Sequence, residues 1–384
     1  MDASQVLWEK WQEQVKGLFP KRHGHQQKLL ALMVAGMVVS GCGVLQRVAE
    51  TIQQQGWSQA KMSRIERRLE RFLAHDQLVV SELWNTFLSQ VLPYWNGKKL
   101  TFVLDCTPYN AQFSIVYLGL LVHSRVLPVA WTVMPGQESW EEGQWDIVAR
   151  LLDTVRGFVP QAQCTLLADR GLAGAPLVRL CVQRQWHYVL RICQEQTCRR
   201  QMGKKKQWSD WSSFKSFIHK KGQQWYGRAR IWQEETLEAY VSASWEETFE
   251  EPWLLISDLP AGKVRIRTYA LRMRVESSFQ DTKTRGWNIE AAQLKVRAHL
   301  DRLLLALFLA VWWVGHLAAS CIHHGQRDRF DRHDRRDKGI FRLGRLWLLD
   351  ILRRARSRSV SIPPSSYGGT IEIESTSGPS DSWS

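Results

Sequence analysis

The segment LTFVLD, residues Leu100–Asp105, has the pattern of a strand that is buried on both faces and ends in an acid. It is a continuous apolar run and does not alternate as a half-exposed strand would. CTLLAD, residues Cys164–Asp169, repeats this pattern. A charged acid at the end of a buried strand is costly unless it is paired, hydrogen-bonded or bound to a metal ion. One such acid alone is more often a satisfied turn or cap residue, so the two together suggest a site.

The elements around these two strands predict an α/β fold. Two further strands, Ile115–Val122 and Val126–Val133, follow the first strand and indicate an antiparallel meander. A helix over Glu141–Phe158 precedes the second acid-bearing strand, and a helix at Ala175–Gln185 and a strand at His187–Ile192 follow it. This order is typical of a mixed sheet with helices on its faces. The two acids would lie close together if their strands are neighbours.

A third region of interest is YALRMRVESSFQDTK, residues Tyr269–Lys283. On a helix with about 100° per residue, its polar residues fall within roughly 60° of one another. Such a stripe is either a solvated face with an ordinary ion pair at i, i+4 or one wall of a functional site. The residues of the stripe are Tyr269, Arg272, Glu276 and Lys283.

Three acids, one of them in the stripe, suggest a metal-binding function. If Asp105, Asp169 and Glu276 converge in a partly dry site, their like charges raise one another's pKa values, and a divalent cation relieves the repulsion. Ligation by oxygen alone favours Mg²⁺ or Mn²⁺, and these ions also hold phosphate oxygens. The hypothesis requires Glu276 to lie within several ångströms of both aspartates.

Composition points to a folded protein with a polyanionic partner. The chain has 384 residues, of which 44% are hydrophobic, and a formal net charge of +15 at pH 7. This length allows a large core and more than one domain. The charge favours nucleic acid, with an anionic membrane surface as the alternative. Seven cysteines without a CxxC pair favour reduced thiols in a cytosolic protein and give no zinc site.

The apolar run Leu303–Ile322 is about as long as a membrane-spanning helix. His316 and Ser320 interrupt it, and basic residues flank both ends, so no orientation in a membrane is indicated. A helix that is apolar on all sides is equally what a large core needs. We therefore interpret it as a core helix and expect no membrane partner. With Asp2 and Glu9, the N-terminus does not have the pattern of a signal peptide.

The remaining segments flank or interrupt the sheet. The first 95 or so residues have helical periodicity and basic clusters at Lys21–His25 and Lys61–Arg71, which indicate either DNA binding or a solvated helical surface. Residues 193–266 show short strand-like runs and are interpreted as a mostly β insertion. Their Lys204–Lys206 run is a solvated loop or a phosphate contact. The Ser/Pro/Gly-rich end, Ser359–Ser384, is expected to be disordered.

Taken together, these residues resemble the bacterial insertion-sequence transposases of the cut-and-paste DDE type that carry a Y-R-E-K signature. Tyr269, Arg272, Glu276 and Lys283 match the spacing of that signature without a gap. The resemblance covers residues 98–320 and implies a ribonuclease H-like mixed sheet with helices on both faces, interrupted by a β insertion and preceded by a helical N-terminal domain. From periodicity, composition and this resemblance together, the expected segments are 1–97, helical and DNA-binding; 98–192, first part of the catalytic core; 193–266, β-rich insertion; 267–322, second part of the core with the Glu-bearing helix; 323–358, basic C-terminal region; and 359–384, disordered tail.

The resemblance also implies roles for individual residues. Asp105, Asp169 and Glu276 would bind two Mg²⁺ ions, for which Mn²⁺ can substitute, spaced about 3.5–4 Å apart for an in-line phosphodiester displacement. The signature residues Tyr269, Arg272 and Lys283 would grip phosphates near the transposon end. Trp253, in EPWLLISDLP, matches the position at which such proteins stack a flipped base during hairpin formation. The alternative for Trp253 is an aromatic residue packed in the core.

The implied partners are double-stranded DNA, at both transposon ends and target, and a second copy of the chain in the synaptic complex. The implied location is the bacterial cytoplasm, in association with the nucleoid. Two other functions remain open at the level of sequence: a ribonuclease H-like nuclease without strand transfer, and a non-catalytic DNA-binding repressor derived from a transposase.

Overall fold

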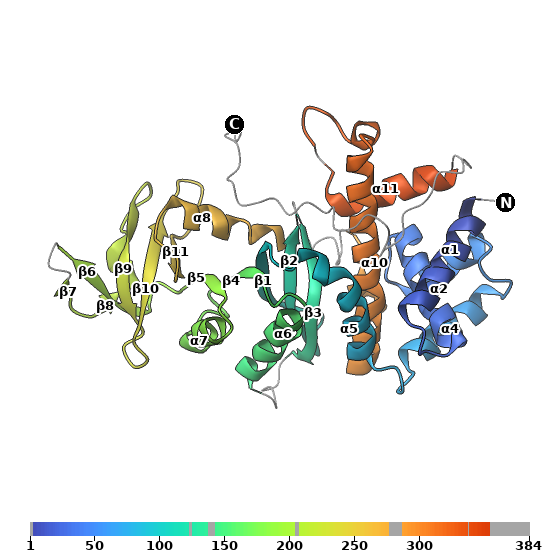
Figure 1. The fold of residues 1–384 in the computed structure, drawn as a ribbon, viewed down its shortest axis with the longest axis horizontal. Coiled ribbons are helices and arrows are strands. Elements are labelled where there is room, and N and C mark those ends of the chain that lie inside the picture. Colours follow the sequence, from blue (N-terminus) through green and yellow to red (C-terminus); the bar gives the residue numbers. More distant parts are fainter. Residues whose placement is uncertain are drawn as a thin grey trace.

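The fold is that of a computed structural model of the chain, in which a long mixed sheet lies on one side of a long helix and a group of shorter helices lies on the other (Figure 1). The predicted disordered tail falls outside the residues that the structure describes. The described residues are 3–122, 125–136, 143–203, 207–275, 286–336 and 338–353.

The N-terminal region is helical, as the periodicity predicts. Helix α2 is apolar on all sides and buried along most of its length, and it meets α3 at a bend of 91°. The indole of Trp11 in α1 stacks on Trp313 of the long helix α10 at 4.3 Å, which ties this region to the rest of the core. Its elements are α1 (Ala3–Leu18), α2 (Gly24–Ser40), α3 (Leu45–Gln54), α4 (Met62–Leu73), α5 (Val80–Val91) and the 3₁₀ helix η1 (Leu92–Trp95).

The first three strands form the predicted antiparallel meander, β1 to β2 to β3. Strand β4 then pairs with β1 in parallel, and β5 pairs with β4 in parallel, so the two acid-bearing strands are neighbours. Short apolar runs produce these strands because both faces of the sheet are covered. The bounds are β1 (Lys99–Pro108), β2 (Phe113–Val122), β3 (Arg125–Pro135), β4 (Gln163–Ala168) and β5 (His187–Arg191).

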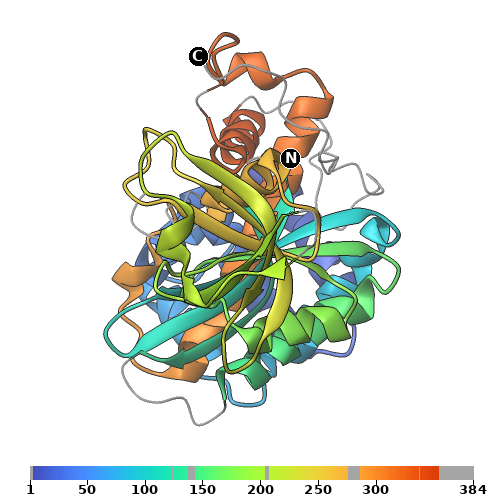
Figure 2. The same ribbon diagram turned by 90° about the vertical axis from the view of Figure 1, so that its left-hand side faces the viewer.

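The β-rich segment extends the same sheet. Strand β11 pairs with β5, and β10, β9, β6 and β7 follow in that order, which gives an eleven-stranded sheet when β8 is included. The sheet twists strongly along its length, so its two ends cross in the view of Figure 2. The bounds are β6 (Thr197–Met202), β7 (Gln207–Trp208), β8 (Ser212–Ser213), β9 (Gln224–Ile231), β10 (Leu237–Ser244) and β11 (Trp253–Ser257).

Helices cover both sides of the sheet. Helices α6 (Gln144–Phe158) and α7 (Ala175–Gln183) lie on one side in Figure 1, and α8 (Lys263–Ala270) lies on the other. Phe102 stacks on Trp186 at 5.0 Å on the α7 side. The 3₁₀ helix η2 (Phe214–Phe217) contacts the extension of the sheet, with the Phe217 ring 4.4 Å from the ring of Trp225. The result is the mixed α/β architecture expected of a ribonuclease H-like domain.

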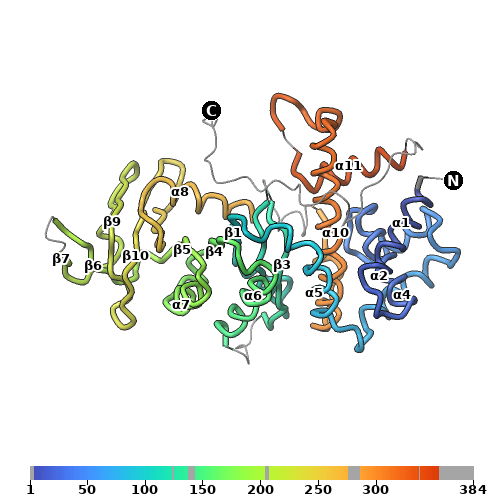
Figure 3. The backbone as a smooth tube through the Cα atoms, viewed as in Figure 1, coloured from blue at the N-terminus to red at the C-terminus, as the bar shows by residue number. Residues whose placement is uncertain are grey.

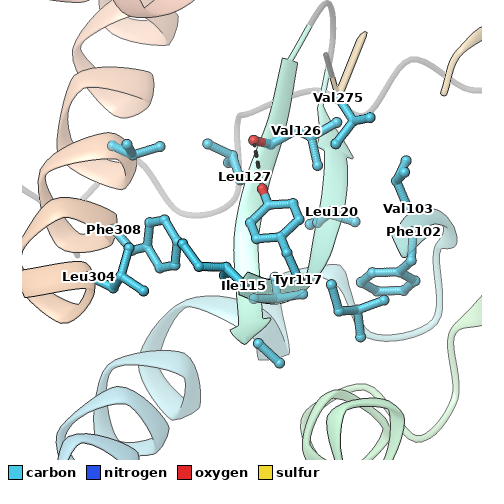
Figure 4. Close-up of a cluster of buried hydrophobic side chains, with 14 of the residues drawn as sticks. Phe102, Val103, Ile115, Tyr117, Leu120, Val126, Leu127, Val275, Leu304 and Phe308 are labelled. Carbon is cyan, nitrogen blue, oxygen red and sulfur yellow. Dashed lines mark hydrogen bonds between the residues drawn. The ribbon is translucent and has the colours of Figure 1, made fainter. Parts of the chain in front are cut away.

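Helix α10 (Arg297–His323) runs through the middle of the molecule (Figure 3). Within the described residues it is the one unbroken helix long and apolar enough to span a membrane, and 83% of its apolar window is buried inside the protein. Its Phe308 packs against Tyr117 of β2, as Figure 4 shows. The apolar character of α10 is therefore accounted for by its place in the core.

Helix α11 (Ile340–Arg353) crosses α10 at close range. A Cβ added at Gly344 would lie 2.0 Å from the Val314 carbonyl oxygen, so the contact requires glycine at this position. Two 3₁₀ helices, η3 (Ile289–Ala292) and η4 (Arg327–Arg329), complete the described elements after α8. All seven cysteines are free thiols, as expected for a chain without a disulfide framework.

Candidate active site

Asp105 and Asp169 are brought together by the parallel pairing of β1 and β4. Leu104 lies opposite Ala168, the last residue of β4, and each aspartate is the next residue in its chain. Asp105 was predicted to end its strand, and this is wrong, because β1 continues to Pro108 and Asp105 pairs with Tyr117 of β2. The apolar run stops at Asp105, but the backbone pairing with β2 does not. The buried carboxylate thus lies beyond the end of β4, on a residue inside a longer strand.

One arginine connects the two carboxylates. The Nη2 atom of Arg272 donates to Oδ2 of Asp105 at 3.0 Å and to Oδ2 of Asp169 at 3.2 Å. The Arg272 side chain is only 8% exposed, the Asp105 side chain 12% and the Asp169 side chain 35%. The pair of acids therefore converges on a single cationic group in a site that opens to solvent on the Asp169 side.

Backbone amides fix the remaining carboxylate oxygens. Oδ1 of Asp105 accepts a hydrogen bond from the Cys106 amide at 2.9 Å, and Oδ1 of Asp169 accepts one from the Gly171 amide at 3.0 Å. In both residues, these bonds leave Oδ2 directed at the shared cation. The side chains are held by the strand and by the turn after it.

The charges of the two acids act on titratable groups next to them. Burial raises the pKa of the Cys106 thiol, and the charges of Asp105 and Asp169 raise it further. Burial also raises the pKa of the Tyr117 hydroxyl, again with a contribution from Asp105. Two carboxylate oxygens directed at one point supply the type of donor that a hard divalent cation prefers.

The third predicted ligand, Glu276, and the predicted phosphate-binding residue Lys283 lie outside the described residues. Among the residues that are described, no group of three or more His, Cys, Asp or Glu side chains is arranged to hold a metal ion. The two aspartates thus supply two carboxylates of a site.

The expectation that Tyr269–Lys283 forms one helix is wrong at its start. Helix α8 ends at Ala270, and the next residues form turns, with the Arg272 amide donating to the Tyr269 carbonyl at 2.8 Å. Helical structure resumes at residues 273–275. Tyr269 and Arg272 therefore belong to different elements. The break directs the Arg272 side chain to the aspartates.

Tyr269 and Trp253 lie in the core. Tyr269 is 2% exposed and Trp253 is 8% exposed. Their rings meet edge to face at 5.1 Å, and Trp253 also stacks on Phe249 at 4.5 Å. Burial raises the pKa of Tyr269 to about 12, with Arg272 acting in the opposite direction, so the hydroxyl remains protonated at neutral pH. In this structure Trp253 is therefore an aromatic residue packed in the core, which is the alternative that we gave for it from the sequence.

The sheet face that carries the aspartates also carries a basic surface that sequence reasoning did not single out. Directly paired residues connect Val103, which is two residues before Asp105, to Arg228 of β9 without a change of face. The pairs run through Val103, Leu167, Val189, Ser257, Tyr240 and Arg228.

We call this surface the arginine face; it consists of Arg199, Arg228, Arg230, Trp208 and Tyr240. The guanidinium of Arg228 lies 5.5 Å from the ring centre of Tyr240, and that of Arg230 lies 4.5 Å from the ring centre of Trp208. Both arginines also pair with one glutamate, Glu238, and stay 42% and 37% exposed, respectively. Alternation in YGRARI, residues 226–231, is the sequence signal that could have indicated it.

The N-terminal helices contribute a second basic surface. Helix α4 buries Ile65, Leu69 and Phe72 against its neighbours. Its opposite side exposes four arginines. None of the ion pairs found among the described residues includes any of them. These arginines are Arg64, Arg67, Arg68 and Arg71.

A mixed sheet in which adjacent strands bring two aspartates together is the architecture expected of the ribonuclease H-like nucleotidyl transferases. Residues 109–313, more than half of the chain, match the family model described as the transposase DDE domain. The chain belongs to the DDE transposase family, whose members bind DNA, cleave and transfer its strands, and generally use divalent metal ions. Asp169 lies inside the matched region, and Asp105 lies four residues before it. No individual curated protein matches the chain.

Proposed function

We propose that the chain is a cut-and-paste transposase of the Y-R-E-K type that cleaves DNA at the ends of its own element and joins the freed ends to target DNA. The observation that carries the proposal is the convergence of the Asp105 and Asp169 carboxylates on one cationic position, 3.0 and 3.2 Å from the Arg272 nitrogen. Glu276 is proposed as the third carboxylate because it directly follows Val275, a fully buried residue three positions after Arg272, and Arg272 contacts both aspartates.

The chemistry requires a divalent metal, for which the two aspartates and Glu276 are the proposed ligands. Two Mg²⁺ ions, or Mn²⁺ in their place, would supply Lewis acidity for the attacking and leaving oxygens. In the cleavage step a water oxygen forms a bond to phosphorus and the bond to the 3′ oxygen breaks, leaving a 3′ hydroxyl and a 5′ phosphate. In the joining step that hydroxyl attacks a target phosphodiester, and a target 3′ oxygen leaves.

The protein groups around the metal site are proposed to position DNA. Lys283 and Arg272 would hold phosphates of the transposon end, and Tyr269 would support them from the core. Trp253 is proposed to stack a flipped base in a hairpin intermediate, which requires it to leave its contacts with Phe249 and Tyr269. Two copies of the chain, one at each element end, would form the active complex in the bacterial cytoplasm.

The arginine face supports a direction for the bound duplex. It lies on the aspartate-bearing face of the sheet, four strand spacings from β4, which is about 19 Å. That distance corresponds to about six base pairs of duplex. Exposed arginines beside aromatic rings suit phosphate contacts, because the guanidinium binds phosphate oxygens and the ring holds it in place.

The experiment uses purified full-length chain, Mg²⁺ and a plasmid that carries the DNA flanking both sides of the gene. Wild-type protein should excise the flanked segment and give joined products with target plasmid. Glu276→Ala should retain DNA binding in a mobility-shift assay and give neither product. Cleavage without joined products would point to a nuclease without strand transfer. Retained cleavage by Glu276→Ala would refute the proposed site.

A further inference from the structure

Arg272 contributes a positive charge at the point where the acids converge. Its guanidinium is buried, and the same nitrogen contacts a carboxylate oxygen on each of two adjacent strands. Two carboxylates next to each other repel, and an arginine nearby favours the ionised form of each. The guanidinium therefore supplies part of the charge that a divalent cation would otherwise supply.

The backbone on either side of Arg272 is anchored. Tyr269 is buried against Trp253, and Val275 is fully buried near Val126 (Figure 4). The Val275 amide donates to the Arg272 carbonyl at 2.8 Å, which closes the turn. The backbone of Arg272 is thus held between two buried residues, so an exchange of partners by its guanidinium would involve the side-chain bonds of Arg272 itself.

We propose that Arg272 is a resident counter-cation of the metal site, which competes with the divalent ion for Asp105 and Asp169 and is displaced when the ion binds. This inference rests on the proposed function of the two aspartates and adds a regulatory role to it. A divalent ion that binds both Oδ2 atoms takes away both partners of Nη2, and this nitrogen is then available to a DNA phosphate. Displacement therefore delivers the guanidinium to the DNA and couples metal binding to DNA binding.

Competition predicts a direction that a purely structural role does not. An arginine beside a carboxylate typically changes its proton affinity by 1–3 pKa units, so its removal should tighten cation binding by about tenfold or more. If Arg272 served only to hold the aspartates in place, its removal would loosen the site and weaken cation binding. The sign of the change separates the two roles.

The test measures Mn²⁺ binding to the full-length chain without DNA. The electron paramagnetic resonance signal of free Mn²⁺ reports how much ion remains unbound. Arg272→Gln should bind Mn²⁺ about tenfold more tightly than wild type, and Arg272→Lys should be tightened less but in the same direction. Arg184→Gln is the matched control, because Arg184 forms a bidentate ion pair with Asp153 away from the site. Its Mn²⁺ affinity should equal that of wild type. If Arg272→Gln does not fold, as judged by circular dichroism, the lysine variant decides the sign.

The outcomes distinguish this inference from the proposed function. If Asp169→Asn leaves Mn²⁺ binding unchanged, the proposed metal site itself is wrong. If Asp169→Asn abolishes binding but Arg272→Gln binds Mn²⁺ equally or more weakly than wild type, only the counter-cation role is overturned. Tighter binding by both Arg272 variants with loss of binding in Asp169→Asn supports both.

Discussion

Oδ2 of Asp105 and Oδ2 of Asp169 accept hydrogen bonds from the same nitrogen, Nη2 of Arg272, at 3.0 and 3.2 Å. The two acids are 64 positions apart in the sequence, and the parallel pairing of β1 with β4 is what makes them neighbours. We therefore expect the loss of either carboxylate to impair catalysis to the same extent, because neither carboxylate can replace the other in the site.

Asp105→Asn and Asp169→Asn are each expected to abolish DNA cleavage and joining while DNA binding is retained. Asparagine keeps the shape and one acceptor oxygen but removes the charge that a divalent cation needs. Product gels and mobility shifts measure the two properties on the same preparation. Asp153→Asn, a surface acid paired with Arg184, is the control and should cleave as wild type does. Cleavage by either active-site variant near the wild-type rate would contradict the assignment.

Substitutions at Trp253 distinguish a role in core packing from a role in stacking a flipped base. Trp253→Ala should destabilise the fold by about 3–5 kcal/mol, because it leaves a cavity between Phe249 and Tyr269. Trp253→Phe should preserve most of the stability but reduce hairpin products, since a smaller ring stacks a flipped base less well.

The control for this pair is Trp186→Phe, which alters a buried indole stacked on Phe102 on the opposite side of the sheet. It should lower stability by a similar amount and leave the product distribution unchanged. Denaturation and product analysis on denaturing gels provide both readouts. Equal hairpin yields for Trp253→Phe and wild type would remove the stacking role.

The arginine face is expected to contribute to DNA affinity. Replacing Arg228 and Arg230 by alanine should weaken binding by about tenfold or more and make the log–log salt slope less negative by about 2, because two phosphate contacts are lost. Fluorescence anisotropy over a series of salt concentrations measures both. The loss should vanish for duplexes that extend less than about six base pairs from the cleavage position.

Arg179→Ala serves as the control for that experiment. Arg179 lies on α7, on the other side of the sheet, and pairs with Glu235 at 2.6 Å. Its removal changes the net charge of the chain without touching the arginine face. The control removes one positive charge and the test variant removes two, so a loss of binding free energy half as large in the control would show that the effect is one of total charge.

His316 predicts how stability depends on pH. Burial in α10 lowers its pKa from 6.5 to about 4, so the folded state holds the ring neutral. Below pH 6.5 the unfolded chain binds a proton that the folded chain does not, and stability falls as the pH decreases toward 4, by up to about 3 kcal/mol. His316→Leu should lose this component, so its unfolding free energy should change less between pH 7 and pH 5. An identical pH profile for variant and wild type would contradict it.

Much of the architecture could be predicted from the sequence because its signals are local. The apolar runs at Leu100–Leu104 and Cys164–Ala168 indicate strands, and an acid after each run indicates where to look for a site. The order of strands and helices then predicts a mixed sheet. The helices of the N-terminal region are likewise predicted by the periodicity of their apolar residues.

The features that were missed depend on tertiary contacts. The break after Ala270 has no Gly or Pro to indicate it, since the sequence there is YALRMR. Strand β1 extends past Asp105 because β2 supplies a partner, and β11 joins β5 because their backbones meet in space. The contact of Arg272 with two aspartates follows from that break and from the β1–β4 pairing. Spacing along a single helix could not have revealed it.

The most direct test of the metal site is anomalous diffraction at the manganese edge from crystals of the full-length chain soaked in Mn²⁺. The proposed function predicts an anomalous peak between the carboxylates of Asp105 and Asp169, with oxygens of both residues at about 2.0–2.3 Å from it. The Arg272 guanidinium should then have moved out of hydrogen-bonding distance of both acids. A fully soaked crystal with no peak at this position, and with Arg272 still bonded to both aspartates, would contradict it.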